Sequence, residues 1–294
     1  MSDPVETLST GSAFYVTPKG RMVLGEGVIY RASDSTLHWF DCLSSPAELY
    51  ILPVDPETGS ATGPARILPL SDSVTIAAFR QNKPRSYIAA YYQGVCFLDE
   101  ETGKLEVACE IIPSAERSQR RFNDGGVDAA GRFWLAENDL AATAFPLENY
   151  RRTMGFPGVV CGVYLNDSVG MKITALDFDL ASGSISNPRT LVDFRGTSGE
   201  PDGMVLDVEG NLWVAVYGTS HIMVFTPQGK LLKQIALPAM YPTCPTWGGK
   251  NQDILYITTA KDRTETPDPN DEGGHMYMAH VGKVQGQVKH EFRG

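Results

Sequence analysis

A unit of four short strands recurs along the 294-residue chain, and this repeat constrains the fold more than any other feature. Runs of four to seven β-branched and aromatic residues, closed by Gly, Asn, Asp or Pro, dominate the sequence, and helical periodicity is almost absent. Residues 203–235 show a whole unit, in which MVLDV, LWVAVY, HIMVFT and KLLKQI follow one another through short turns. Units of this kind are typical of the blades of a β-propeller.

Six aromatic residues mark the second strand of successive units: Trp39, Tyr87, Trp134, Tyr164, Trp213 and Tyr256. Most neighbours in this series are roughly 45 residues apart, which is the length of a blade. The series therefore predicts an all-β, six-bladed β-propeller that forms a single domain over residues 1–294, with a flexible segment over 1–15. The interval from Trp134 to Tyr164 is only about 30 residues, so we expect one shortened blade around residues 137–166.

Charge and hydropathy narrow the range of partners and locations. The formal net charge of −10 would repel a phosphate backbone or an anionic membrane surface, so we expect no nucleic acid and no membrane partner. No run approaches the roughly 20 apolar residues of a membrane span, and the first residues lack the features of a signal peptide. The five cysteines are scattered without a CxxC motif. We expect most of them to be buried and reduced, which favours a cytoplasmic location.

Four polar segments each precede the first strand of a unit, so they should occupy equivalent places at one end of the central channel. They are LGEGVIY with Glu26, RRFNDGGVD with Arg121, Asn123 and Asp124, EPDGMVLD with Glu200 and Asp202, and YPTCPTWGG with Thr243 and Cys244. Carboxylate and amide oxygens suit a divalent cation such as Ca²⁺, Mg²⁺, Mn²⁺ or Zn²⁺. Each segment alone is also ordinary turn chemistry, but the recurrence at matched positions favours a functional site.

The segments LGEGVIY, RFNDGGVDAAGRFW, PDGMVLDVEGNLWVAVYG and CPTWGGKNQDILYITTA resemble signature segments of the SMP-30/gluconolactonase/regucalcin family. The resemblance extends from about residue 22 to residue 280 and implies a metal-dependent lactonase on a six-bladed propeller. In that family a Glu, an Asn and an Asp hold the metal. By this similarity Glu26 and Asp202 would be metal ligands, and Asp202 would also be the general base. Arg121 and Asn123 would bind the substrate.

The sequence departs from the family at the third metal ligand. The resemblance implies an Asn-Gly segment between Ala136 and Tyr164, and none occurs there. Other polar residues of this region, outside the expected motif, are Asn138, Asp139, Asn149 and Asn166. Three explanations stay open: the metal site is incomplete, a substitute ligand comes from this region, or a piece of the gene is missing from the sequence.

The sequence thus predicts a hydrolase that opens a small-molecule lactone with one divalent metal ion and with Asp202 as general base. One alternative is a catalytically degenerate propeller that binds a small molecule or Ca²⁺, because fold does not fix function. Another is a hydrolase of a different ester substrate. The chain has no GxSxG nucleophile elbow and no Walker motif, so neither a serine triad of that kind nor a phosphate-binding loop is expected.

Overall fold

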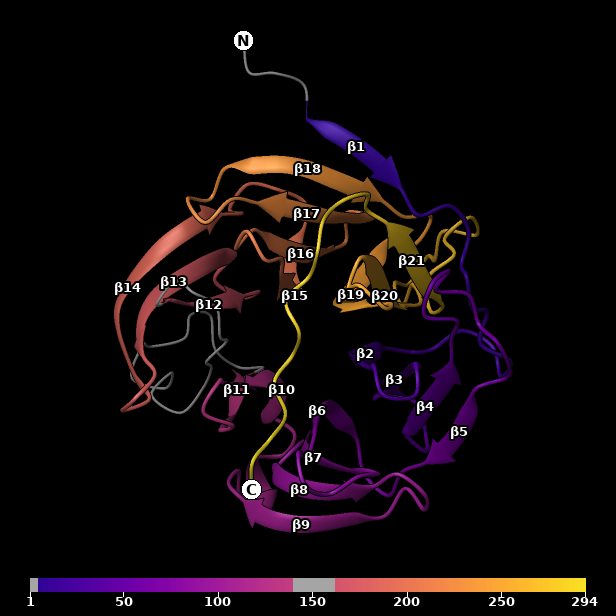
Figure 1. Ribbon diagram of the computed structural model, residues 1–294, viewed down its shortest axis with the longest axis vertical. Helices are drawn as coiled ribbons and strands as arrows, with labels where there is room; N and C mark the ends of the chain where they lie inside the picture. Colours follow the sequence, from indigo (N-terminus) through magenta and orange to yellow (C-terminus); the bar gives the residue numbers. More distant parts are fainter. Residues whose placement is uncertain (1–4, 140–161) are drawn as a thin grey trace.

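A computed structural model describes residues 5–139 and 162–294, and nearly all regular structure in these ranges is β-strand. One 3₁₀ turn, Ser114–Glu116, accompanies the strands. Figure 1 shows the sheets arranged around a central axis, each with one strand near the axis and others toward the rim. The prediction of an all-β propeller is therefore confirmed.

The described strands form six hydrogen-bonded sheets of unequal size. Two have four strands: β2 (Gly25–Arg31), β3 (Thr36–Asp41), β4 (Glu48–Pro53) and β5 (Arg66–Pro69); and β6 (Val74–Phe79), β7 (Ser86–Tyr91), β8 (Gly94–Asp99) and β9 (Leu105–Glu110). One has five: β15 (Glu200–Leu206), β16 (Leu212–Tyr217), β17 (His221–Phe225), β18 (Leu231–Ala236) and β1 (Glu6–Ser9). Two have three: β12 (Gly162–Asp167), β13 (Lys172–Asp179) and β14 (Ser184–Asp193); and β19 (Tyr241–Gly248), β20 (Ile254–Ala260) and β21 (Met276–His280). The last is the pair β10 (Arg120–Val127) and β11 (Phe133–Asp139).

The six-bladed count is not confirmed by this arrangement. In the described part of the chain, five sheets have three or more strands, and β10 and β11 form a ribbon of two. The expected shortening lies directly after β11, and much of the 137–166 region falls outside the described residues. The blade that contains RFNDGG is thus represented by only its first two strands.

The strands nearest the axis form the wall of the channel. The inner strand β2 packs against β6 and β19, β6 packs against β10, and β15 packs against β19 and β12. Five of these strands, β2, β6, β10, β15 and β19, carry a β-bulge near the start or middle of the strand. A bulge redirects side chains and is frequent beside active sites. The bulges therefore place the polar segments predicted from the sequence at one level of the channel.

Two turns that follow inner strands are built on the same contact between an aspartate and a tryptophan. The indole Nε1 of Trp134 donates to Asp128 at 2.8 Å, and that of Trp213 donates to Asp207 at 3.0 Å. Both aspartates also accept hydrogen bonds from main-chain amides of their own turns. The repeated segments VDAAGRFW and LDVEGNLW therefore stabilise the turn between the first two strands of a blade, which explains why they recur.

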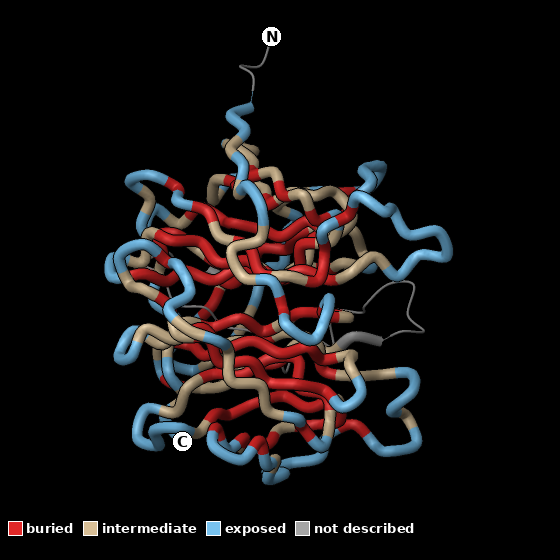
Figure 2. The backbone as a smooth tube through the Cα atoms, turned by 90° about the vertical axis from the view of Figure 1, so that its right-hand side faces the viewer, coloured by how far each residue is buried: buried red, intermediate tan, exposed pale blue. Residues whose placement is uncertain are grey.

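Apolar side chains fill the space between adjacent sheets. Figure 2 shows buried backbone in the strands and exposed backbone mainly in the connecting loops. Four of the six aromatic markers, Trp39, Tyr87, Trp213 and Tyr256, have no exposed surface. The rings of Trp213 and Trp247 meet edge to face, with centroids 5.0 Å apart, where two sheets pack together. Burial of each such ring contributes roughly 1.5–3 kcal/mol, which makes sheet-to-sheet packing the main source of stability.

Segments near both ends of the chain pack against the ring. The strand β1 pairs in parallel with β18, so the expected flexible segment over 1–15 contains a strand at residues 6–9. The segment 284–294, which we call the C-terminal segment, crosses the centre of the ring in Figure 1. The amide of Gln287 donates to Leu206 O at 3.0 Å, and the amide of Phe292 donates to Phe79 O at 2.8 Å. This segment therefore covers one end of the channel.

Candidate functional site

Three carboxyl groups from different inner strands meet in the channel. Glu26 comes from β2, Asp124 from β10 and Asp202 from β15, each at or beside a bulge. Burial, followed by the charges of Asp202 and Asp124, raises the pKa of Glu26. Burial, followed by the charges of Asp124 and Glu200, raises the pKa of Asp202 to about 8. Mutual effects of this kind require that the carboxyl groups lie close together in a poorly solvated place.

No lysine or arginine forms an ion pair with Glu26, Asp124 or Asp202 among the residues that the structure describes. Gly27 N donates to Glu26 at 3.2 Å, and Gly125 N donates to Asp124 at 2.6 Å. Each of the three side chains keeps partial solvent exposure because it faces the channel. These carboxyl groups, which we call the carboxylate cluster, therefore have no directly paired cation in the described structure, and hard oxygen donors of this type suit a divalent cation.

Glycine is required beside Glu26. Gly27 has a φ of +60°, and a Cβ at this position would lie 2.6 Å from the carbonyl oxygen of Thr75 on the neighbouring inner strand. A side chain at Gly27 would therefore force β2 and β6 apart. The GEG sequence, which looks like a turn, instead allows two inner strands to approach closely at the level of the carboxylate cluster.

Arg121 lies near the carboxylate cluster, and its charge lowers the pKa of both Glu26 and Asp202. Its Nη1 donates to the hydroxyl of Tyr92 at 3.0 Å, and the guanidinium carbon lies 5.2 Å from the centre of that ring. The Nε of Arg121 is buried and has no hydrogen-bond partner in the described structure. Tyr92 thus orients the guanidinium and leaves the buried Nε donor free.

Asn123 lies within the bulge of β10, between Phe122 and Asp124, and it is partly exposed. The structure therefore brings Glu26, Arg121, Asn123 and Asp202 to one region of the channel, although their roles stay predictions. Sequence reasoning assigned no role to Asp124. A bulge changes the alternation of side chains along a strand, so an ordinary alternating pattern could not indicate that Asp124 faces the channel.

The fourth polar segment, YPTCPTWGG on β19, contributes buried side chains to the packing of the channel wall. Thr243 is fully buried, and its hydroxyl donates to Gly25 O at 2.6 Å. Burial raises the pKa of the Cys244 thiol, which disfavours the thiolate that a nucleophile or a metal ligand requires. The expectation that most cysteines are buried is confirmed for Cys42, Cys96 and Cys244, whereas Cys109 is exposed. The remaining cysteine, Cys161, lies outside the described residues.

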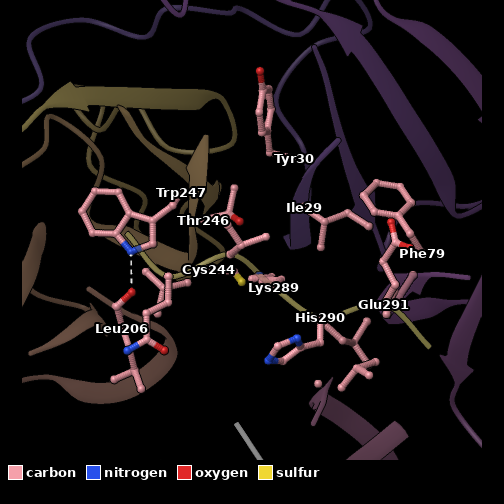
Figure 3. A pocket seen from close by; sticks show the side chains of 18 of the residues that line it. Ile29, Tyr30, Phe79, Leu206, Cys244, Thr246, Trp247, Lys289, His290 and Glu291 are labelled. Carbon is pink, nitrogen blue, oxygen red and sulfur yellow. Dashed lines mark hydrogen bonds between the residues drawn. The ribbon is translucent and has the colours of Figure 1, made fainter. Parts of the chain in front are cut away.

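A cavity of about 220 Å³ occupies the channel between the inner strands and the C-terminal segment (Figure 3). Later residues of the inner strands, such as Ile29, Met204 and Trp247, form its apolar wall. Asp124 and Lys289 of the C-terminal segment both line this cavity, and Lys289 Nζ donates to Val28 O at 3.0 Å. The cavity therefore lies on the side of the carboxylate cluster that the C-terminal segment covers.

One of the four polar residues near the missing Asn-Gly motif contacts the main chain of Asp202. The side-chain amide of Asn166, on β12, donates from Nδ2 to the main-chain oxygen of Asp202. The side chains of Asn138 and Asp139, and all of Asn149, lie outside the described residues.

In residues 5–139 and 162–294, no three His, Cys, Asp or Glu side chains are arranged so that they could hold a metal ion. Any cation at Glu26 and Asp202 therefore needs further oxygen donors, from amides, the main chain or water. The described part of the chain also contains no helix long and apolar enough to cross a membrane.

The chain matches one known protein family over most of its length. The model of the SMP-30/gluconolactonase/LRE-like region matches residues 24–144 and 161–261. A protein of Sulfolobus acidocaldarius without an assigned function is 36% identical over 182 residues, a match that covers 56% of this chain and 64% of that protein. This match thus spans less than two thirds of that relative.

Two further comparisons extend over most of the chain. The Bacillus subtilis protein named "Putative sugar lactone lactonase YvrE" is 29% identical over 273 residues, which is 84% of this chain and 89% of that protein. The crystal structure of a calcium-binding protein, regucalcin, from Agrobacterium tumefaciens has a TM-score of 0.80 at 20% identity and covers 99% of this chain and 100% of that chain. At this identity the likeness shows the fold alone.

Proposed function

Because this chain belongs to the SMP-30/gluconolactonase/LRE-like family, we propose that it is a hydrolase that opens a small lactone with the help of one divalent metal ion. The observation that carries the proposal is the convergence of Glu26, Asp124 and Asp202 in the channel without a paired cation among the described residues. A divalent cation would neutralise these like charges. The name of the Bacillus subtilis relative supports a sugar lactone as the substrate class.

Glu26 and Asp202 are the residues that we assign as metal ligands. Both offer carboxylate oxygens from neighbouring parts of the channel wall, and this chemistry suits Ca²⁺, Mg²⁺, Mn²⁺ or Zn²⁺. When bound, such a cation would supply Lewis acidity toward the lactone carbonyl.

Asp202 is the general base in this proposal. Without a metal, burial together with the charges of Asp124 and Glu200 raises the pKa of Asp202 to about 8, and a bound cation would lower this pKa and favour the ionised carboxylate that can accept a proton. Asp202 would take a proton from water as the water oxygen attacks the carbonyl carbon. The ring C–O bond then breaks, and the proton passes to the leaving alkoxide, which gives a hydroxy acid.

Arg121 and Asn123 would orient the substrate. The guanidinium of Arg121 is held by the hydroxyl of Tyr92 and retains a buried Nε–H without a partner. A guanidinium and an amide can donate hydrogen bonds to substrate hydroxyl or carbonyl oxygens. Positive charge at Arg121 would also favour the negative charge that develops on the substrate as the ring opens.

Hydrolysis of a panel of aldonolactones, followed by acid release in weak buffer, tests this function. We expect EDTA to abolish activity and one added divalent cation to restore it. Asp202→Asn should lower kcat by at least about 100-fold, because it removes the base and a ligand charge. Full activity of Asp202→Asn would show that the proposed mechanism is wrong. Glu209→Gln, an exposed change in a distant turn, serves as the control that keeps activity.

A second candidate is a propeller that binds a small molecule without catalysis. It is favoured by the absence, in the described residues, of three acidic, histidine or cysteine side chains arranged for a metal. The metal content of the purified protein separates the two candidates. About one divalent ion per chain would support the hydrolase, whereas a folded protein that neither retains nor takes up metal would support the binding protein.

A further inference from the structure

The cavity beside the C-terminal segment is separate from the proposed active site. Asp124 lines it, but Glu26, Arg121, Asn123 and Asp202 do not. The strands β2, β6, β15 and β19 and the C-terminal segment supply most of its wall, and all five lie within the described residues. Because regular strand pairing holds the four strands, this part of the wall is formed before any ligand binds.

The wall of this cavity is mostly apolar and includes aromatic rings. Figure 3 shows Ile29 and Phe79 on one side of the cavity and Trp247 on the other, and Tyr30 lines it too. In another protein, an apolar cavity of about 150 Å³ stays dry and binds benzene. The present cavity of about 220 Å³ is larger, so two fused rings would fit its size. Aromatic walls favour an aromatic ligand.

The charges around the cavity favour a ligand without charge. Arg31 already pairs with two carboxylates outside the lining, at 2.8 and 2.5 Å. Burial lowers the pKa of His290, so this histidine is uncharged at neutral pH. The other ionisable groups that point to a charge preference are the ammonium of Lys289 and the carboxyl groups of Asp124 and Glu291. A cation would meet the ammonium, an anion would meet the carboxyl groups, and either would lose its hydration.

Lys289 supplies hydrogen-bond donors at the edge of the apolar wall. Its Nζ donates to Val28 O at 3.0 Å, which is its one hydrogen bond to the described part of the chain. An ammonium has three N–H donors, so two have no partner among these residues. A pocket that is mostly apolar, with few polar groups that converge on it, is typical of small-molecule sites. A ligand here should therefore carry one hydrogen-bond acceptor.

We propose that this cavity is a second binding site, for a neutral molecule of two fused aromatic rings with one hydrogen-bond acceptor. The rings would lie against Ile29, Phe79 and Trp247, and the acceptor would face Nζ of Lys289. The site goes beyond the proposed hydrolysis and does not depend on it, because the proposed metal ligands take no part in it.

Equilibrium dialysis of the whole protein with quinoline and with naphthalene tests this site. The two molecules have the same shape, but only quinoline has a ring nitrogen that accepts a hydrogen bond. The wild type should bind both. Lys289→Met should weaken quinoline binding at least about tenfold and should not weaken naphthalene binding, because hydrogen bonds from charged donors are strong. Lys283→Met, an exposed change outside the lining, is the matched control and should bind both like the wild type.

Variants that fill the cavity give a second measurement. Ile29→Phe and Met204→Phe each place a ring in the cavity from a different strand, and each should weaken the binding of both molecules at least about tenfold. Val107→Phe, on the exposed strand β9, is the matched control and should bind both normally. EDTA should leave quinoline binding unchanged, since the site contains no metal ligand of the proposed active site.

A wild type that binds neither molecule would overturn the site. Wild-type affinity in both Ile29→Phe and Met204→Phe would overturn it too, because it would place the molecules elsewhere. Equal effects of Lys289→Met on quinoline and naphthalene would overturn the contact between the acceptor and the ammonium. Loss of quinoline binding in EDTA would show that its nitrogen binds a metal ion, which also contradicts the proposal. Circular dichroism confirms that each variant is folded.

Discussion

At the scale of single residues, ionisation of the carboxylate cluster is unfavourable in the folded protein. Glu26, Asp124 and Asp202 all have a raised pKa, and burial is the first cause in each case. A group whose pKa is higher in the folded than in the unfolded state stabilises the fold at low pH, and this contribution is lost as the pH rises through the folded value. A bound cation would reverse this effect, because it favours the ionised carboxylates.

The metal-free protein should therefore lose stability as the pH rises. Asp202 has a pKa near 3.8 when unfolded and about 8 when folded, so its contribution should decline between about pH 4 and pH 8. Urea unfolding in EDTA, followed by circular dichroism across this range, measures the effect. Asp202→Asn should show a flatter dependence on pH and greater stability than the wild type at pH 8. The same slope in both proteins would contradict the prediction.

At the scale of strands and sheets, a polar network joins two neighbouring blades. The guanidinium of Arg31, at the end of β2, forms two hydrogen bonds with Glu100, at 2.5 and 3.0 Å. The hydroxyl of Tyr87 donates to Glu100 at 2.9 Å and lies 2.8 Å from Nδ1 of His38. Burial and the charge of Arg31 lower the pKa of His38 to about 3, so this histidine is neutral and serves the packing between sheets.

Tyr87→Phe should destabilise the protein by about 1–3 kcal/mol, because it leaves the buried His38 and Glu100 each without one partner. Thermal unfolding and urea unfolding measure the change. Tyr91→Phe is the matched control: it lies on the same strand and is also buried, and no hydrogen bond of its hydroxyl is found in the described structure. A loss of stability as large in Tyr91→Phe as in Tyr87→Phe would show that the hydrogen bonds of this network do not stabilise the protein.

The sequence predicted the strands well because alternation and turn residues are local properties. The aromatic markers Trp39, Tyr87, Trp213 and Tyr256 are fully buried on the second strands of their sheets. Glu26 and Asp202 could be proposed because their segments recur at matched positions. The channel-facing position of Asp124 could not be predicted, because it results from a bulge, and the contact of Asn166 with Asp202 could not be predicted, because it joins two separate sheets. Both depend on tertiary arrangement rather than on local pattern.

At the scale of the whole molecule, the ring is held by contacts between segments distant in sequence. The C-terminal segment pairs with Asp207 through Gly286 and with Arg80 through Phe292, on different sheets. Gly286 lies directly on the ring of Trp247, since a Cβ there would be 1.9 Å from an atom of the indole. The segment thus covers the cavity and links the sheets on two sides of the channel.

Gly286→Ala should displace the C-terminal segment and lower stability by about 1–3 kcal/mol, because even one methyl group overlaps Trp247. Hydrogen exchange of the amides of Gln287 and Phe292, which bond to inner strands, should become faster. Gly63→Ala is the matched control, since a Cβ there meets only Pro53 at 3.5 Å. Unchanged exchange in Gly286→Ala would contradict this account of the segment.

The strand β12 runs opposite to β15, since Asn166 bonds to Asp202 and Ser168 bonds to Pro201, and this direction matters for anyone who redesigns the interior of the ring. Along β2, β10 and β15, a higher residue number means a position farther from the carboxylate cluster and nearer the cavity, as from Asp202 to Met204. Along β12 the order is inverted, and Tyr164 precedes Asn166 although it borders the cavity. A mutant library ordered by distance from the carboxylate cluster must therefore number β12 in the opposite direction to β15, and Tyr164 is the position on β12 at which the shape of the cavity can be changed.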